Sequence, residues 1–142
     1  KVGKEIARIA GADFHEINPG EIYTSADLDW TDKKSRSSVE MNDPSARPEI
    51  ANSVADMGSY DTVIVGFPIW WGVAPRIIET FLESYDFSGK KIIPFCTSGG
   101  SGVGKSDTAL HKNVTGDVKW AKGRQINRPN EAEIRRWLNE VQ

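Results

Sequence analysis

Hydrophobic positions along this chain follow two different periods, and the change from one to the other predicts helices and strands in turn. Apolar residues recur at helical spacing over 1–10, after Pro75 and over 131–141. The runs at 61–67 and 91–96 are almost continuously apolar, which is typical of strands that a sheet buries on both faces. Weaker patterns predict a strand over 12–17, a helix over about 49–57, a helix over about 105–112 and a strand near 118–122.

The order of these elements predicts an α/β fold, in which a parallel sheet carries helices on both faces. In such folds, ligands bind beyond the carboxyl ends of the strands. Two loops follow the strongest strands, at 68–74 and 97–104, and they form the candidate site. The helix that begins at Pro75 is expected to face the sheet with Ile77, Ile78, Phe81 and Leu82.

The length of 142 residues suits a single domain, 1–142. Gly11 is a natural end for the first helix. The polar stretch 18–48 shows no period, and such long irregular segments are usually functional covers or disordered. We therefore expect 18–48 to be an irregular cover segment.

The composition excludes several classes of protein. Eighteen Lys and Arg against twenty Asp and Glu leave a net charge of −2 without a basic cluster, which argues against a nucleic-acid partner. No apolar run approaches the length of a membrane-spanning helix. The single cysteine, Cys96, cannot form an internal disulfide, and no Cys/His cluster has the spacing of a metal site. A reducing, cytoplasmic location without a structural metal is expected.

The first candidate loop places two indoles where a buried strand ends, so that a planar ligand can stack on either of them. Its residues are Pro68, Ile69, Trp70, Trp71 and Gly72. Simple packing of both rings is the alternative, because Trp is highly buried on average.

The second candidate loop offers backbone N–H groups and hydroxyls with few side chains in the way, because glycine lets a ligand approach the main chain closely. Its residues are Thr97, Ser98, Gly99, Gly100, Ser101 and Gly102. Residues 99–106 (GGSGVGKS) also satisfy the phosphate-binding pattern GxxxxGK[ST]. A nucleotide binder is therefore a rival hypothesis, although no later apolar strand ends in the aspartate that would hold magnesium.

Other candidates favour ordinary roles. Cys96 lies on a buried strand and is expected to be an inert core thiol. His15 and His111 have no Ser or Cys partner in a recognisable motif. The acidic residues of the cover segment are expected to form a solvated loop face: Asp27, Asp29 and Asp32.

At these residues the sequence resembles the flavodoxin-like family, and within it a bacterial flavoprotein subgroup that carries the loop PIWWG at 68–72. The resemblance covers nearly the whole chain. Its other matching segments are 23–30 (YTSADLDW), 37–44 (SSVEMNDP), 47–48 (RP) and 95–102 (FCTSGGSG).

The resemblance implies a three-layer sandwich with a parallel sheet of order 2-1-3-4-5 and FMN at the switch point of the sheet. It implies that Trp70 stacks on the isoalloxazine, that Pro68, Ile69, Trp71 and Gly72 line its edge, and that Thr97, Ser98, Gly99, Gly100, Ser101 and Gly102 contact its carbonyls and nitrogens. No protein nucleophile or acid–base residue is required, because FMN carries the electrons.

Family members grip the FMN phosphate with a Ser/Thr-rich loop that follows the first strand. The sequence contains neither that loop nor that strand, since residues 1–10 resemble the later part of the first helix. The strand over 61–67 and the strand over 12–17 are therefore each expected to keep an unpaired edge.

Three functions remain open. An FMN-dependent oxidoreductase that passes hydride from NAD(P)H to a quinone-like acceptor leads, because the second loop has no aromatic residue to cover the flavin and a charge of −2 gives little steering. A one-electron flavodoxin follows, and Tyr23 or Trp30 of the cover segment could then close the open flavin face. The nucleotide binder at 99–106 comes last, and a homodimer stays open.

Overall fold

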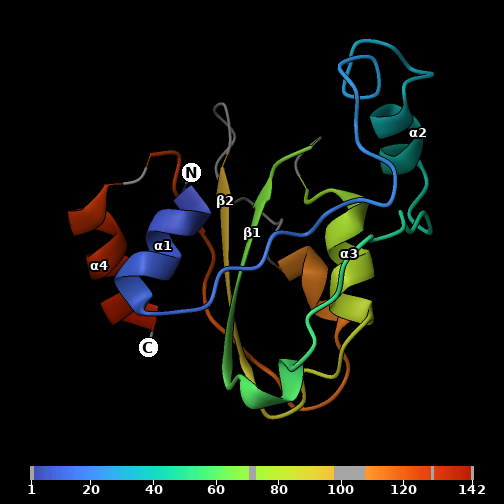
Figure 1. Ribbon diagram of the computed structural model, residues 1–142. Coiled ribbons are helices and arrows are strands. Elements are labelled where there is room, and N and C mark those ends of the chain that lie inside the picture. Colours follow the sequence, from blue (N-terminus) through green and yellow to red (C-terminus); the bar gives the residue numbers. More distant parts are fainter. Residues whose placement is uncertain (1, 71–72, 98–107, 129, 142) are drawn as a thin grey trace.

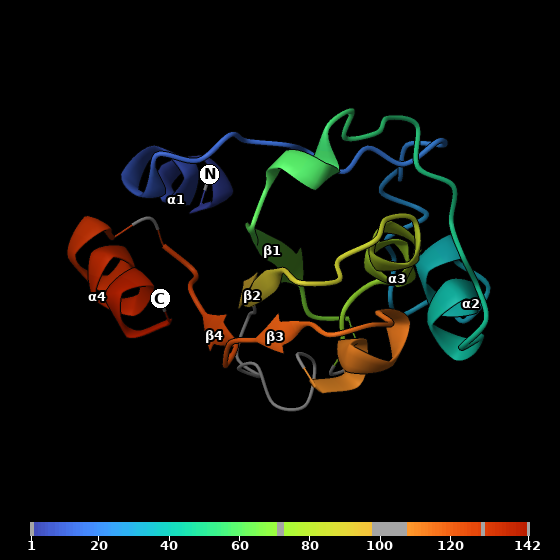
Figure 2. The same cartoon turned by 90° about the horizontal axis from the view of Figure 1, so that it is seen from below.

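The computed structural model describes residues 2–70, 73–97, 108–128 and 130–141, and it has three layers (Figure 1). A sheet forms the middle layer, with α1 and α4 on one face and α3 on the other (Figures 1 and 2). The helices are α1 (Val2–Ala10), α2 (Arg36–Asn42), α3 (Arg76–Glu83) and α4 (Glu131–Val141), with short 3-10 helices at Met57–Ser59 and Thr108–Asn113. The strands are β1 (Thr62–Pro68), β2 (Lys91–Thr97), β3 (Lys119–Trp120) and β4 (Arg124–Gln125).

The sheet is parallel and is centred on β2. On one side β2 pairs with β1 along its whole length, from Thr62 opposite Lys91 to Pro68 opposite Thr97. On the other side β2 pairs first with β3 and then with β4, so that the two short strands together act as one interrupted strand. This arrangement confirms the α/β fold with a parallel sheet.

Alternate side chains of β2 enter two separate cores. Ile92 and Cys96 are fully buried in the core under α3. Ile93, which is also fully buried, and Phe95 face the opposite core, between the sheet and the pair α1 and α4. A strand with a core on each face must be apolar throughout, which explains the continuous apolar run at 91–96.

The strongest sequence signals are confirmed. The helices over 1–10 and 131–141 and the strands over 61–67 and 91–96 are present, and Gly11 ends α1 with φ of 66°. The four apolar residues expected to face the sheet from α3 are all buried: Ile77, Ile78, Phe81 and Leu82. The strand near 118–122 is shorter than expected, and the described part of the helix over 105–112 is a 3-10 helix.

Two predicted elements are wrong. Residues 12–17 form no strand, because no other strand in the described ranges lies beside them to complete a ladder. Residues 49–56 form no helix, because their backbone bonds to a distant part of the chain instead. Gly20 N donates to Glu49 O at 2.7 Å and Ala51 N donates to Asn18 O at 2.7 Å, which holds this stretch extended.

The outer edge of β1 is open. Among the described residues no strand pairs with this edge, and a cavity of about 1500 Å³ runs along it. Residues of α1, of 10–17 and of α3 border the cavity together with β1. Val63 and Ile64 line it and are only half-buried, whereas the corresponding positions of β2 are fully buried. The expectation of an unpaired edge at 61–67 is thus met in the structure.

None of the helices in the described ranges is long and apolar enough to cross a membrane.

Gly66 lets the ring of Phe95 lie across the backbone of β1. The two residues are direct neighbours in the β1–β2 register, and a Cβ atom at Gly66 would overlap the Phe95 ring. Gly66→Ala is expected to lower the free energy of unfolding by about 1–3 kcal/mol, because the ring must leave its place in the core. Chemical denaturation measures the change.

Gly58→Ala is the matched control. Gly58 has nothing within 4 Å of a built Cβ atom, so this substitution should leave the stability nearly unchanged. Equal stability of the two variants would contradict the packing role of Gly66.

Candidate functional site

The two candidate loops begin side by side at the carboxyl ends of β1 and β2. Pro68 lies opposite Thr97 in the register, and Ile69 N donates to Thr97 O at 3.3 Å. The chain then turns back at once, because Trp70 N donates to Val73 O at 2.8 Å and Val73 N donates to Trp70 O at 3.2 Å. The structure therefore brings Pro68, Ile69, Trp70 and Thr97 together.

The remaining candidates of both loops fall outside the described residues: Trp71, Gly72, Ser98, Gly99, Gly100, Ser101 and Gly102. The same holds for the whole phosphate-binding pattern at 99–106.

The large cavity reaches this end of the sheet. Pro68, Trp70 and Thr97 line it together with Tyr23 of the cover segment. Trp70 is half-buried, so that part of its ring is available to a ligand. A planar, largely apolar molecule that lies beyond the carboxyl ends of β1 and β2 would contact an indole, a proline and a phenol.

Tyr23 is held against Trp70 by a set of polar contacts. Its ring meets the Trp70 ring edge-on, with 5.7 Å between the centroids and 78° between the planes. Its hydroxyl donates to Glu40 Oε1 at 2.5 Å, and the Arg36 guanidinium lies 3.9 Å from the centre of its ring. Arg36 in turn donates to Glu40 Oε2 at 3.0 Å and to Glu21 O at 2.7 Å. These contacts fix both the position and the tilt of the phenol.

The environment of Tyr23 favours the neutral phenol. Burial raises the pKa of Tyr23 well above its usual range, and the hydrogen bond to the Glu40 carboxylate raises this pKa further. Tyr23 is therefore a neutral hydrogen-bond donor at ordinary pH, and its proton is committed to Glu40.

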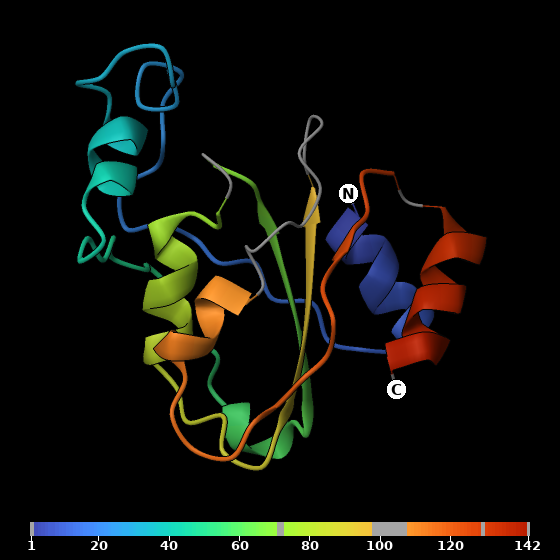
Figure 3. The ribbon, with the colours of Figure 1, turned by 180° about the vertical axis from the view of Figure 1, so that it is seen from behind.

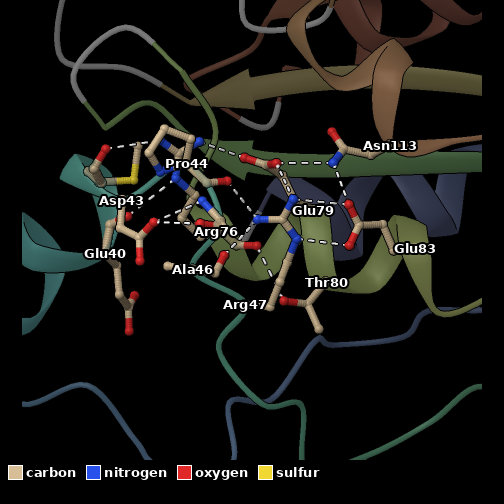
Figure 4. Close-up of polar contacts among 12 residues, drawn as sticks. Glu40, Asp43, Pro44, Ala46, Arg47, Arg76, Glu79, Thr80, Glu83 and Asn113 are labelled. Atoms are coloured by element: carbon tan, nitrogen blue, oxygen red, sulfur yellow. Dashed lines mark hydrogen bonds and ion pairs between the residues drawn. The ribbon is translucent and has the colours of Figure 1, made fainter.

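A network of buried charges attaches the cover segment to α3 (Figure 4). At its centre lies Glu79, whose side chain is 5% exposed. Glu79 Oε1 accepts from Arg76 at 2.7 Å, while Glu79 Oε2 accepts from Asn113 at 3.0 Å and lies 3.2 Å from an Arg47 nitrogen. Arg47 also binds Glu83 through two bonds of 2.8 and 3.0 Å, and this pairing lowers the pKa of the Glu83 carboxyl.

Both arginines also grip the backbone of the cover segment. Arg76 donates to the carbonyls of Glu40 and Met41 at 3.3 and 2.9 Å, at the end of α2. Arg47 donates to the carbonyls of Pro44 and Ala46 at 2.9 and 2.7 Å. The network thus satisfies main-chain acceptors as well as charges, and it holds α2 beside α3, away from the sheet (Figures 1 and 3).

The weaker candidates of the sequence take structural positions. Cys96 is fully buried. His111 stacks on Trp120, with 4.2 Å between the ring centroids, and His15 lies 6.3 Å from the ring of Phe81. The carboxylates of Asp27, Asp29 and Asp32 accept hydrogen bonds from backbone N–H groups nearby and stabilise local turns.

Sequence reasoning missed the charge network and the helix α2. The arginines and glutamates are spaced along the chain like ordinary surface residues, so their pattern carries no signal of burial. The only usable signal for α2 was Ser35, which caps this helix by accepting from Ser38 N.

Comparisons with known proteins agree with this architecture. A protein-family model described as Flavodoxin matches residues 1–141. A proposed flavoprotein of Bacteroides eggerthii DSM 20697 is 49% identical with a TM-score of 0.92, and the match covers 97% of this chain and 86% of that one. A proposed flavoprotein of Bacteroides uniformis ATCC 8492 is 46% identical with a TM-score of 0.90, and this match covers 96% and 86%.

A more distant structure is that of a flavoprotein of Lactobacillus acidophilus NCFM in complex with FMN. It shares 19% identity and a TM-score of 0.57, over 96% of this chain and 90% of that one, and this likeness concerns the fold. None of the curated proteins compared with the chain matches it.

Removal of the Glu79 carboxylate should be costly, because it leaves two arginines without their buried partner. Glu79→Ala is expected to lower the free energy of unfolding by about 3–5 kcal/mol, as measured by chemical denaturation. The matched control is Glu131→Ala, which removes an exposed helical carboxylate paired with Arg135 at 2.7 Å. This control should cost at most about 1 kcal/mol, and a similar loss in both variants would contradict a special role for Glu79.

The Tyr23 phenol should ionise later than an ordinary tyrosine. Because the folded state raises its pKa, the associated stabilisation is fully present below about pH 10 and is lost as the pH rises further. Ring-carbon NMR shifts of tyrosine report ionisation residue by residue, and Glu40→Ala should bring that of Tyr23 to lower pH. An ordinary pKa for Tyr23 in the folded protein would contradict the assigned environment.

Proposed function

The chain belongs to the flavodoxin family, and from that premise we propose that it is a redox protein that binds FMN at the carboxyl ends of β1 and β2. The observation that carries the proposal is the meeting of Pro68, Trp70, Thr97 and Tyr23 at one end of the large cavity. The flavoprotein of Lactobacillus acidophilus, which shares the fold, is a complex with FMN.

The described residues fit the ring system of FMN. Trp70 offers a half-buried indole on which the isoalloxazine stacks, and Pro68 and Ile69 line the edge of the ring. Thr97 begins the loop 97–102, whose glycines allow backbone N–H groups to approach the ring carbonyls. When bound, FMN supplies a ring system that takes up two electrons and passes them on.

The side chains of the protein act by orientation and by exclusion of water. The turn at Trp70 fixes the indole at the end of β1, and the contacts of Tyr23 with Glu40 and Arg36 hold a neutral phenol against it. Because the Tyr23 ring meets Trp70 edge-on, it does not stand opposite the indole as the second wall of a flavin sandwich. This geometry supports an open flavin face that a small reactant can reach.

The reaction in this proposal is the reduction of a small quinone-like acceptor by NAD(P)H. NAD(P)H gives up a hydride, and the quinone takes up two electrons and two protons to become a hydroquinone. Two features support a reductase over a one-electron carrier. The net charge of −2 offers little long-range attraction to a protein partner, and apolar side chains beside Trp70 remain exposed, namely Leu28 and Trp30.

Flavin titration tests the cofactor assignment. We expect the protein with its natural amino terminus to bind FMN, to shift the visible spectrum and to quench the flavin fluorescence. Trp70→Ala should weaken binding by about tenfold and restore fluorescence, because the stacking contact is lost. Trp120→Ala is the control, since Trp120 lies on β3 and contacts His111 instead.

The outcomes separate the rival functions. No flavin binding would overturn the proposal, and magnesium-dependent ATP binding that is lost in Lys105→Ala would then favour the nucleotide binder. Flavin binding without NAD(P)H-dependent reduction of a quinone would contradict the reductase and favour the one-electron carrier.

A further inference from the structure

A second cavity lies on the side of Trp70 that faces the cover segment. Its volume is about 290 Å³, and it is lined by Leu28, Trp30 and Ser37 of the cover segment and by Ile69 and Trp70 of the first loop. We propose that this cavity binds a neutral bicyclic aromatic ring that carries a carbonyl group, such as 1,4-naphthoquinone. The inference rests on the proposed function, because it names the class of acceptor and the residues that bind it.

The size and charge of the cavity select this class of ligand. Ligand sites commonly measure about 300–1,000 Å³, so a cavity at the lower limit takes one or two fused rings rather than a dinucleotide. No lysine or arginine is among the side chains that line it within the described ranges, so it offers no partner for a phosphate. A neutral ring between the indoles of Trp30 and Trp70 satisfies both conditions.

Exposure of the cavity wall supplies a driving force for binding. Trp30 is 72% exposed and Leu28 is 44% exposed, although both lie beside apolar side chains of the first loop. A flat ligand would remove apolar surface of both residues from water without moving the charge network that anchors α2. Affinity should therefore depend strongly on Trp30.

Ser37 supplies the hydrogen bond that recognises a carbonyl. The hydroxyl of Ser35 donates to Ser38 Oγ at 2.9 Å, and the hydroxyl of Ser38 donates to Asp32 O at 2.8 Å. Each hydroxyl has one proton, so both protons are committed. The Ser37 hydroxyl is left with a contact of 3.5 Å to Ser35 Oγ, at the limit of a hydrogen bond.

Ser37 is itself only 2% exposed. Its hydroxyl can therefore turn toward a ligand carbonyl and lose little by doing so, while water competes poorly for a buried donor. A ring of the same shape that lacks a carbonyl would leave this donor without a better partner, which gives the site its selectivity.

The experiment compares 1,4-naphthoquinone with naphthalene on the flavin-free protein, by equilibrium dialysis. We expect the wild-type protein to bind the quinone about tenfold more tightly than the hydrocarbon, and Ser37→Ala to bring this ratio close to one. The ratio is internal to each variant, so a partial loss of folded protein does not change it. Trp30→Ala should weaken both ligands by about tenfold, whereas Ile22→Ala should weaken neither, because Ile22 is 79% exposed on the same segment and lines neither cavity.

Other results would overturn the inference. Equal affinity of the wild-type protein for both rings removes the role of Ser37, and unchanged binding in Trp30→Ala removes the cavity. If Trp30→Ala leaves quinone binding unchanged but abolishes a dimer in sedimentation, the apolar wall is a contact between two copies instead. Because no flavin is present in this assay, its outcome is independent of the FMN titration, and either proposal can fail alone.

Discussion

The site depends on the burial of Glu79 between Arg76 and Arg47. A buried carboxylate costs several kcal/mol of lost hydration unless cations and hydrogen-bond donors surround it. Here the same two arginines that neutralise Glu79 also bind main-chain carbonyls at the end of α2 and just after it. The electrostatic requirement of one side chain on α3 thus fixes a segment that is distant in sequence.

From this anchor a chain of contacts leads to the candidate site. The helix α2 carries Arg36 and Glu40, which hold the phenol of Tyr23, and Tyr23 lies edge-on against Trp70. The same helix carries Ser37, which faces the smaller cavity. Loss of the anchor would therefore cost the site its aromatic wall as well as stability, because few apolar contacts attach α2 to the sheet.

The sheet places the other half of the site. Parallel pairing of β1 with β2 brings Pro68 opposite Thr97, so that the loop with the indoles and the loop with the glycines start at adjacent points. The open edge of β1 extends the cavity from that point along the strand. An unpaired edge leaves backbone donors and acceptors exposed, and it leaves Val63 and Ile64 half-buried. The half of the site that the sheet builds is thus rigid on the β2 side and open on the other.

The sequence alone determined the elements whose signal is local. The continuous apolar runs at 61–67 and 91–96 and the helical stripe after Pro75 predicted β1, β2 and α3, because burial on both faces or on one face dictates the residue pattern directly. The aromatic and glycine-rich loops predicted the place of the candidate site for the same reason. Only the tertiary structure decided that 12–17 and 49–56 take no regular form, since a strand needs a partner and these backbones bond elsewhere. It also decided that Glu79 is buried and that Tyr23 lies against Trp70. Charged residues and isolated aromatics look alike in sequence whether they are exposed or paired, and only the fold brings their distant partners together.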